Sequence, residues 1–470
     1  MNLVWEWFTL SSLPVKEYLS TSYLHRLLVG GLGSWRQTSI LIQWGDGIAA
    51  ALLGLIYALA PFVPTTLIGF LLGTCVIFWL LLTLSDEATS THRTLVTPIH
   101  LLVLLYWGVA AAATAFSPVK KAAVIDLAYL TLYLMLFTLA ARVLRINRIR
   151  TWLITLYLHI SLIVSVYGIR QWYEGVPPLA TWVDQESAFS KTTRVYSYLG
   201  NPNLLAGYML PAVVLSLVAI FAWRGWYRKA LALTMFIVNT ACLILTFSRG
   251  GWLGLVVGVL AAVALSIYWL NLEFSPIWRT WLLPIVIASV IGLLLIAIIF
   301  VEPVRLRVAS IFLDRKDSSN NFRRNVWDAV FRMIRDRPWI GIGPGHNAFN
   351  KVYPLYQLPR YSALSAYSIF LEVAVETGFI GLACFLWLLV VIFNTAILQL
   401  NQLRQSFNRE GLWLIGAIAT LLGMLTHGTV DTVWFRPEVN TLWWFMVALV
   451  ASYWQPLPPK AESSTPEAAY

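Results

Sequence analysis

The sequence predicts an all-α polytopic integral membrane protein, a helix bundle of about twelve transmembrane helices with one large periplasmic loop. Two observations lead to this fold class. Hydrophobic residues make up 59% of the 470-residue chain and charged residues only 12%, about half of the charged share in an average soluble domain. The apolar residues also gather in runs of about 20, the length at which a helix crosses the hydrocarbon core with its backbone groups bonded internally.

Taken in order, the apolar runs divide the chain into five parts. Residues 1–38 form a cytoplasmic N-terminal segment, 39–301 hold nine transmembrane helices, 302–367 form the periplasmic loop, 368–455 hold three more helices, and 456–470 form a disordered cytoplasmic tail. The expected transmembrane ranges are Ser39–Ala60, Pro64–Leu84, Pro98–Phe116, Ala122–Val143, Thr151–Gln171, Asn203–Phe221, Ala230–Phe247, Gly250–Leu270, Trp281–Val301, Ser368–Leu398, Leu412–Gly428 and Asn440–Tyr453.

The distribution of Lys and Arg over the short loops gives the orientation. Loops rich in these residues stay in the cytoplasm, and with the N-terminus inside, the cytoplasmic loops carry the basic residues in an excess of about two to one. Both termini are therefore expected in the cytoplasm, and the long segment 302–367 outside.

Charge and cysteine usage exclude several classes of protein. The net charge is +11, but the basic residues are scattered over loops on both faces of a bilayer, so nucleic acid is not an expected partner. The three cysteines fall in separate predicted helices, which indicates neither a disulfide framework nor a metal site. The chain has no nucleotide-binding glycine loop and no zinc-type motif, so we expect no cofactor and no ATP-driven pump.

The predicted periplasmic loop contains one strongly patterned stretch, Asn325–Asp336. Val326, Val330 and Ile334 fall on one helical face there, which predicts an amphipathic helix lying along the membrane surface. The glycine-rich turn 341–345 follows it.

Arg249 is the first candidate for binding and catalysis. It lies in Leu245-Thr-Phe-Ser-Arg-Gly-Gly-Trp252, a hairpin so short that its guanidinium must lie near the outer membrane surface between two helices. A guanidinium there offers five donors to phosphate or carboxylate, and it is costly without an anionic partner. An arginine that only anchors the interface is the alternative.

Arg323 and Arg324 precede the predicted surface helix, and Trp327 lies one turn after Arg323. The pair would face Arg249 across an outer cavity and complete a clamp for a diphosphate or a carboxylate. A solvated basic face is the alternative interpretation.

Other polar residues lie at helix ends. Asn201 and Asn203 begin a predicted helix, where asparagine caps the first turn, and both are also candidate substrate contacts. Glu376, in an otherwise apolar helix, balances the arginines, acts as a base or neutralises a buried donor. His427 and Asp431 are four residues apart, so we expect a supporting hydrogen bond on a shared helical face.

Five motifs in this order resemble the O-antigen ligase and polymerase superfamily: Gly200-Asn-Pro-Asn203, Ser248-Arg-Gly-Gly251, Arg323 with Trp327, Gly341-Ile-Gly-Pro-Gly345 with Phe349, and Leu371 through Glu376-Thr-Gly378. The resemblance runs from about Tyr196 to Val391. Over its whole length the chain is similar to a cyanobacterial branch of that superfamily that serves inorganic-carbon accumulation. The residues 194–203, 317–322 and 364–367 carry this second resemblance.

In the ligases, the resemblance implies metal-independent glycosyl transfer, in which outer-face arginines bind the diphosphate of a polyprenyl-linked glycan and a histidine assists the acceptor. Arg249 and Arg323 match those arginines. The ligase pattern His-Asn-x-x-Leu becomes Tyr367-Ser-Ile-Phe-Leu371. Tyr367 is a weak candidate for catalysis, since a tyrosine with its ordinary pKa of about 10 is a poor base at neutral pH.

Three functions remain open, and they differ in whether the chain is an enzyme. The branch resemblance implies a multi-pass protein of the bacterial inner membrane that serves inorganic-carbon accumulation by carrying bicarbonate. The alternative is a glycosyltransferase acting on a lipid-linked saccharide diphosphate at the periplasmic face, with membrane lipids as its surroundings. A third is a binding subunit that keeps the anion site without catalysis. Carriers commonly show inverted repeats and broken helices, and neither is clear here.

Overall fold

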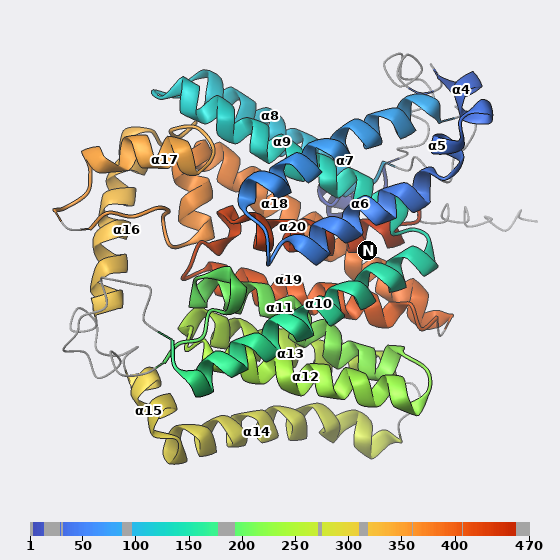
Figure 1. The fold of residues 1–470 in the computed structure, drawn as a ribbon, viewed down its shortest axis with the longest axis vertical. Helices are drawn as coiled ribbons and strands as arrows, with labels where there is room; N and C mark the ends of the chain where they lie inside the picture. Colours follow the sequence, from blue (N-terminus) through green and yellow to red (C-terminus); the bar gives the residue numbers. More distant parts are fainter. Residues whose placement is uncertain are drawn as a thin grey trace, which may run out of the picture.

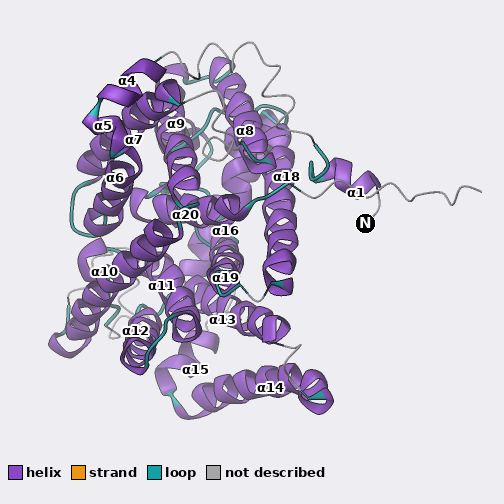
Figure 2. Ribbon diagram, turned by 90° about the vertical axis from the view of Figure 1, so that its right-hand side faces the viewer, coloured by secondary structure: helices purple, strands orange, loops and turns teal. Residues whose placement is uncertain are grey.

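The computed structural model describes residues 3–13, 29, 32–86, 96–176, 193–270, 275–309, 318–359, 361–406 and 408–456, and all regular elements within them are helices (Figures 1 and 2). Ten of these helices are long and apolar enough to cross a membrane. They are α7 (Thr65–Ser85), α8 (Pro98–Ala115), α9 (Lys120–Val143), α10 (Asn147–Glu174), α11 (Pro202–Ala222), α12 (Trp226–Leu245), α13 (Arg249–Leu270), α14 (Pro276–Phe300), α18 (Ile369–Gln405) and α19 (Gly411–Gly428). The chain is therefore a multi-pass, all-α membrane protein.

The prediction of about twelve transmembrane helices exceeds this number because its first and last ranges form shorter helices. The backbone leaves the helical conformation at Ser39, which separates α4 (Gly33–Thr38) from α5 (Ile40–Gln43), and α6 (Gly45–Leu59) follows Trp44. The last range is α20 (Pro437–Tyr453). With 15 and 17 residues, α6 and α20 are shorter than the run of about 20 that a span usually needs.

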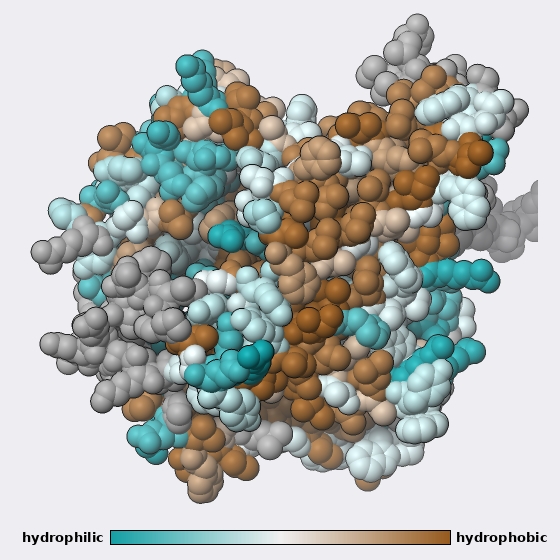
Figure 3. All heavy atoms as spheres, viewed as in Figure 1, coloured by the Kyte–Doolittle hydropathy of each residue, from teal (hydrophilic) through white to brown (hydrophobic). Residues whose placement is uncertain are grey.

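The surface supports the membrane assignment. In Figure 3 hydrophobic side chains form a broad band across the face, and hydrophilic ones gather on its left side, where Figure 1 places α16 (Ser318–Asp336) and α17 (His346–Val352). A band of apolar side chains flanked by polar ones matches a bilayer bounded by water.

Three helices, α11, α13 and α19, pack closely through small residues. A Cβ added to Gly254 of α13 would lie 2.7 Å from the carbonyl oxygen of Gly423 in α19 and 2.5 Å from Leu210 Cδ1 in α11. Small residues let helix backbones approach in this way within membranes. The close packing brings the start of α13, which carries Arg249, next to the end of α19.

The predicted amphipathic helix begins earlier than expected and is buried by protein. It is α16, and its apolar residues Val326, Val330 and Met333 form a small core with α17 and the start of α18. The prediction of a helix lying along the membrane surface was incomplete. The sequence pattern identifies the apolar face of a helix but does not tell whether lipid or protein covers that face.

The helix α18 breaks at Gly378, whose φ of 68° and ψ of −171° are non-helical. The turn 341–345 fills the break: the amide of Ile342 donates to Val375 O at 3.0 Å and that of Gly343 to Glu376 O at 2.9 Å. A Cβ on Gly341, φ 74°, would meet Glu376 O at 2.5 Å. Glycine is therefore required here for close backbone approach.

The other end of α9 carries a separate set of ion pairs. Arg142 donates to Asp86 Oδ1 at 2.8 Å, and Arg36 pairs with the same carboxylate. Arg150 of α10 pairs with Glu410 at 2.5 Å. Each of these three arginines pairs with a carboxylate, which offsets the cost of burying its charge.

The helix α1 (Leu3–Phe8) lies beside α18 (Figure 2). Trp5 Nε1 donates to Asn394 Oδ1 at 3.0 Å, and Trp387 Nε1 donates to Phe8 O at 2.7 Å. The described part of the N-terminal segment is thus attached to the bundle. The predicted tail from residue 457 onward lies outside the described residues.

Candidate anion-binding site

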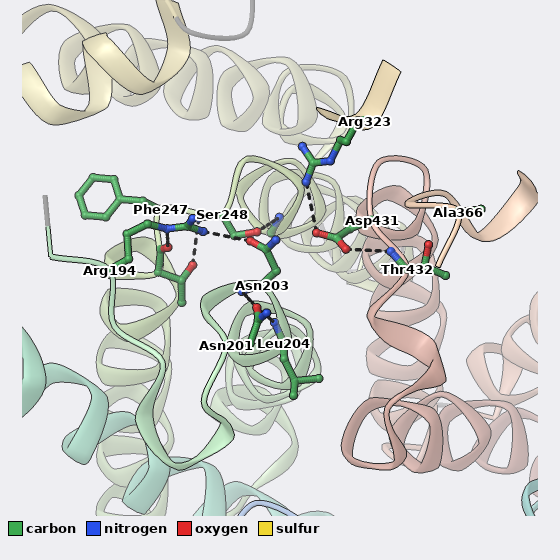
Figure 4. A network of polar contacts seen from close by, with 12 residues as sticks. Arg194, Asn201, Asn203, Leu204, Phe247, Ser248, Arg323, Ala366, Asp431 and Thr432 are labelled. Atoms are coloured by element: carbon green, nitrogen blue, oxygen red, sulfur yellow. Dashed lines mark hydrogen bonds and ion pairs between the residues drawn. The ribbon is translucent and has the colours of Figure 1, made fainter. Parts of the chain in front are cut away.

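Three arginines from separate segments meet beside the start of α13. Arg194 precedes α11, Arg249 begins α13 and Arg323 lies in α16 (Figure 4 shows Arg194 and Arg323). Burial, followed by the positive charges of Arg323 and Arg249, lowers the pKa of Arg194 to about 10, against the opposing effect of the Asp431 carboxylate. Arg194, Arg249 and Arg323 are called the arginine cluster below. Since these positive charges repel one another, the cluster favours an anionic ligand.

Arg194 is held from behind by the α12–α13 turn and by the start of α11. Its Nε donates to Thr246 O at 2.9 Å, and its NH2 group donates to Asn203 Oδ1 at 3.0 Å (Figure 4). Asn201 Oδ1 accepts from the amides of Asn203 at 2.8 Å and Leu204 at 3.2 Å. The expected helix cap at Asn201 is thereby confirmed, and Asn203 positions an arginine.

Arg249 is 8% exposed and is the first residue of α13. Phe247, two residues earlier, has φ 50°, and its carbonyl accepts from Arg307 Nε at 2.9 Å. A non-glycine residue in this region costs of order 1–3 kcal/mol, and such residues gather at functional sites. A Cβ on Gly250 would lie 2.7 Å from the His427 ring, so this glycine lets α13 approach α19.

Arg323 pairs with Asp431, NH2 to Oδ2 at 3.3 Å, and both side chains are largely buried. Asp431 Oδ1 also accepts the amide of Thr432 at 2.8 Å (Figure 4). The expectation that Asp431 continues the helical face of His427 is wrong, because α19 ends at Gly428 and the chain turns Asp431 toward Arg323. Arg324, the next residue of α16, is exposed.

Tyr367 lies on Arg323, with the guanidinium carbon 6.0 Å from the ring centroid. Its φ is 51°. Burial raises the pKa of Tyr367 to about 12, with the Asp431 carboxylate as the next cause. At neutral pH this phenol is a hydrogen-bond donor and not a base.

Glu376 lies in a different place from the arginines. It lines a cavity of about 410 Å³ together with Asp126, Glu372 and His346. Thr432 also lines this cavity, and since Thr432 follows Asp431, the cavity and the arginine cluster adjoin. In the described part of the chain, no three His, Cys, Asp or Glu side chains are grouped as a metal ion requires.

The sequence patterns missed two residues of this region, Arg194 and Arg307. Neither was a candidate site residue from the sequence, and only the fold brings them to the α12–α13 turn, where each donates to a backbone carbonyl. Arg194 does stand nine residues before Asn203, its partner. No local pattern marks Arg307.

Comparison with known families gave one match, and its range overlaps this region. Residues 230–386 match the family model described as O-Antigen ligase, a range that includes Arg249, Arg323, Tyr367 and Glu376. A comparison with curated proteins gave no match. Together with its ten candidate membrane helices among the described residues, this match makes the chain a multi-pass membrane protein with an O-antigen ligase-like region at residues 230–386, about a third of its length.

Proposed function

We propose that the protein binds the diphosphate of a lipid-linked saccharide at the arginine cluster and transfers the saccharide to a hydroxyl acceptor. The observation that carries this proposal is the convergence of Arg194, Arg249 and Arg323 beside the start of a membrane helix. Guanidinium groups bind phosphate oxygens through paired donors, and buried sites strengthen such contacts. The family match covers Arg249 and Arg323.

In the transfer, the acceptor oxygen bonds to the anomeric carbon as the bond from that carbon to the diphosphate oxygen breaks. The diphosphate leaves with the electron pair, and the hydroxyl proton passes to it. Negative charge grows on the leaving group, which is the charge that preorganised arginines stabilise. Tyr367 would donate a hydrogen bond to the diphosphate, since its raised pKa of about 12 keeps the phenol protonated.

The test is transfer in liposomes that hold the purified full-length protein, a short-chain polyprenyl-diphosphate oligosaccharide carrying a fluorescent sugar, and a neutral glycolipid acceptor. We expect label on the acceptor lipid and free polyprenyl diphosphate with the unmodified protein, and neither with Arg249→Ala. Arg335→Ala, an exposed arginine of the same helix as Arg323, is the matched control and should transfer normally. Equal transfer by Arg249→Ala would overturn the proposal.

Bicarbonate transport, serving inorganic-carbon accumulation, is the second candidate. The observation that favours it is Tyr367, a protonated phenol where the ligase pattern has histidine, which leaves an oxyanion site without a base. The family match gives it no support. Labelled bicarbonate uptake into sealed liposomes, with a sodium gradient imposed or removed, tests it. Uptake that requires Arg249 would establish a carrier and remove the transferase proposal.

A further inference from the structure

The cavity beside the arginine cluster has features that the proposed transfer does not use. Its volume of about 410 Å³ lies within the range of roughly 300–1,000 Å³ that is usual for small-molecule sites. It is partly open, and residues of α7, α8, α9, α18 and α20 line it together with the turn before α17 and the segment 432–437. It is called the aromatic cavity below.

Four buried polar atoms of residues that line it have no hydrogen-bond partner within the described chain: Glu372 Oε1, Thr432 Oγ1, Arg436 Nε and Asn440 Oδ1. Thr432 is only 3% exposed. Buried polar groups are almost always bonded, so four such atoms around one cavity point to a ligand. Their chemistry differs, since Nε donates, Oδ1 accepts and Oγ1 does both.

A hydroxyl group can satisfy each of the four, because it donates and accepts. A metal ion or an ammonium group would satisfy the acceptors alone. The remaining wall is aromatic: Trp434 and Trp443 have ring centroids 3.9 Å apart, and His346 stacks on Phe435 at 5.1 Å with an interplanar angle of 3°. Flat rings beside a few placed polar groups are suited to a ring that has apolar faces and polar edges.

The described wall of the cavity offers an anion no unpaired arginine or lysine. The carboxyl groups of Asp126, Glu372 and Glu376 line the cavity, and its one arginine, Arg436, already pairs with Glu438 at 3.5 Å. A carboxyl group bonds to a hydroxyl whether or not it is protonated, whereas a phosphate would lack a cation to neutralise it here. The occupant is therefore uncharged and rich in hydroxyl groups.

We infer that the aromatic cavity is a binding site for an uncharged saccharide, separate from the arginine cluster. The claim that this cavity holds the acceptor of the transfer rests on the proposed function. The claim that it binds a saccharide does not. The two sites adjoin at Asp431 and Thr432, so a sugar in the cavity would lie next to an anion held by the arginines.

The test is saturation-transfer NMR on the full-length protein in lipid nanodiscs prepared without glycoside detergents, which would compete. The probes are maltose, lactose and sucrose, with inorganic pyrophosphate as the probe of the arginine cluster. We expect saturation transfer to at least one disaccharide, and about tenfold weaker binding in Thr432→Val or Asn440→Leu. The two variants are independent, so one that fails to fold leaves the other as the test.

Arg249→Ala should keep the disaccharide signal and lose pyrophosphate binding. A protein that binds pyrophosphate but none of the three disaccharides would overturn the saccharide site, as would equal signals from the unmodified protein and both cavity variants. Disaccharide binding without pyrophosphate binding would support the cavity and count against the proposed function alone.

Discussion

The arginine cluster and the aromatic cavity share a wall and differ in their ionisable groups. Three arginines lie near Asp431 in the cluster, while three carboxyl groups and one arginine, Arg436, line the described part of the cavity. Since buried cations favour an anion and carboxyl groups give it no opposite charge, the pair separates an anionic group from an uncharged one across a single turn of chain. The boundary between them is one peptide, Asp431 to Thr432.

The largest expected effect is at Arg249. Arg249→Ala should weaken pyrophosphate binding about 100-fold, because it removes a buried guanidinium and its paired donors. Arg249→Lys should recover about a tenth of the lost affinity, since it restores charge without the planar fork. Titration calorimetry in nanodiscs measures both. Unchanged affinity in Arg249→Ala would mean that the cluster is not the anion site.

The packing behind the two sites differs as well. Gly254→Ala, behind the arginine cluster, should lower the free energy of unfolding by about 1–3 kcal/mol, because its Cβ would press on Gly423 O and Leu210. Gly69→Ala, on the cavity wall, is the matched control, since its Cβ would meet nothing nearer than Tyr129 at 4.0 Å. Thermal unfolding followed by fluorescence compares them. Equal loss at both positions would contradict the tight α13–α19 contact.

A smaller effect is expected at the boundary residue. Asp431→Asn removes the carboxylate that pairs with Arg323 at 3.3 Å. The freed guanidinium should bind pyrophosphate about fivefold more tightly, a gain of about 1 kcal/mol that is typical of a partly screened ion pair. Disaccharide binding should not change. If pyrophosphate binding weakens instead, Asp431 is needed to position Arg323.

The two sites also differ in how far the sequence predicts them. Arg249 and Arg323 stand in short motifs next to glycine and tryptophan, so each could be recognised locally, and both belong to the cluster. Asp126 and Arg436 are isolated charges more than 300 residues apart, and only the packing of α9 against α20 unites them. A pattern of spacing within one helix cannot report such a contact.

The fold shows the same limit. Hydrophobic runs predicted the helices of the bundle, because each satisfies its own backbone hydrogen bonds and needs no partner to form. They did not predict that Asp431 leaves the helix of His427, or that the apolar face of α16 meets α17 and not lipid. Those outcomes depend on which surfaces meet, and that information is not local.

The smallest expected effect concerns Tyr367 and pH. Because burial and Asp431 raise the pKa of this phenol to about 12, it stays protonated from pH 6 to pH 10, and transfer should not increase over that range through its ionisation. Tyr367→Phe should reduce transfer by no more than about threefold, the loss of one neutral hydrogen bond. Tyr367→His introduces a group with an ordinary pKa of about 6.5, so its transfer rate should rise as pH increases through that value and the imidazole loses its proton. A transfer rate that rises above pH 9 in the unmodified protein and not in Tyr367→Phe would show that the phenol acts as a base. The proton of the acceptor hydroxyl would then pass to Tyr367 in the arginine cluster and not to the leaving diphosphate.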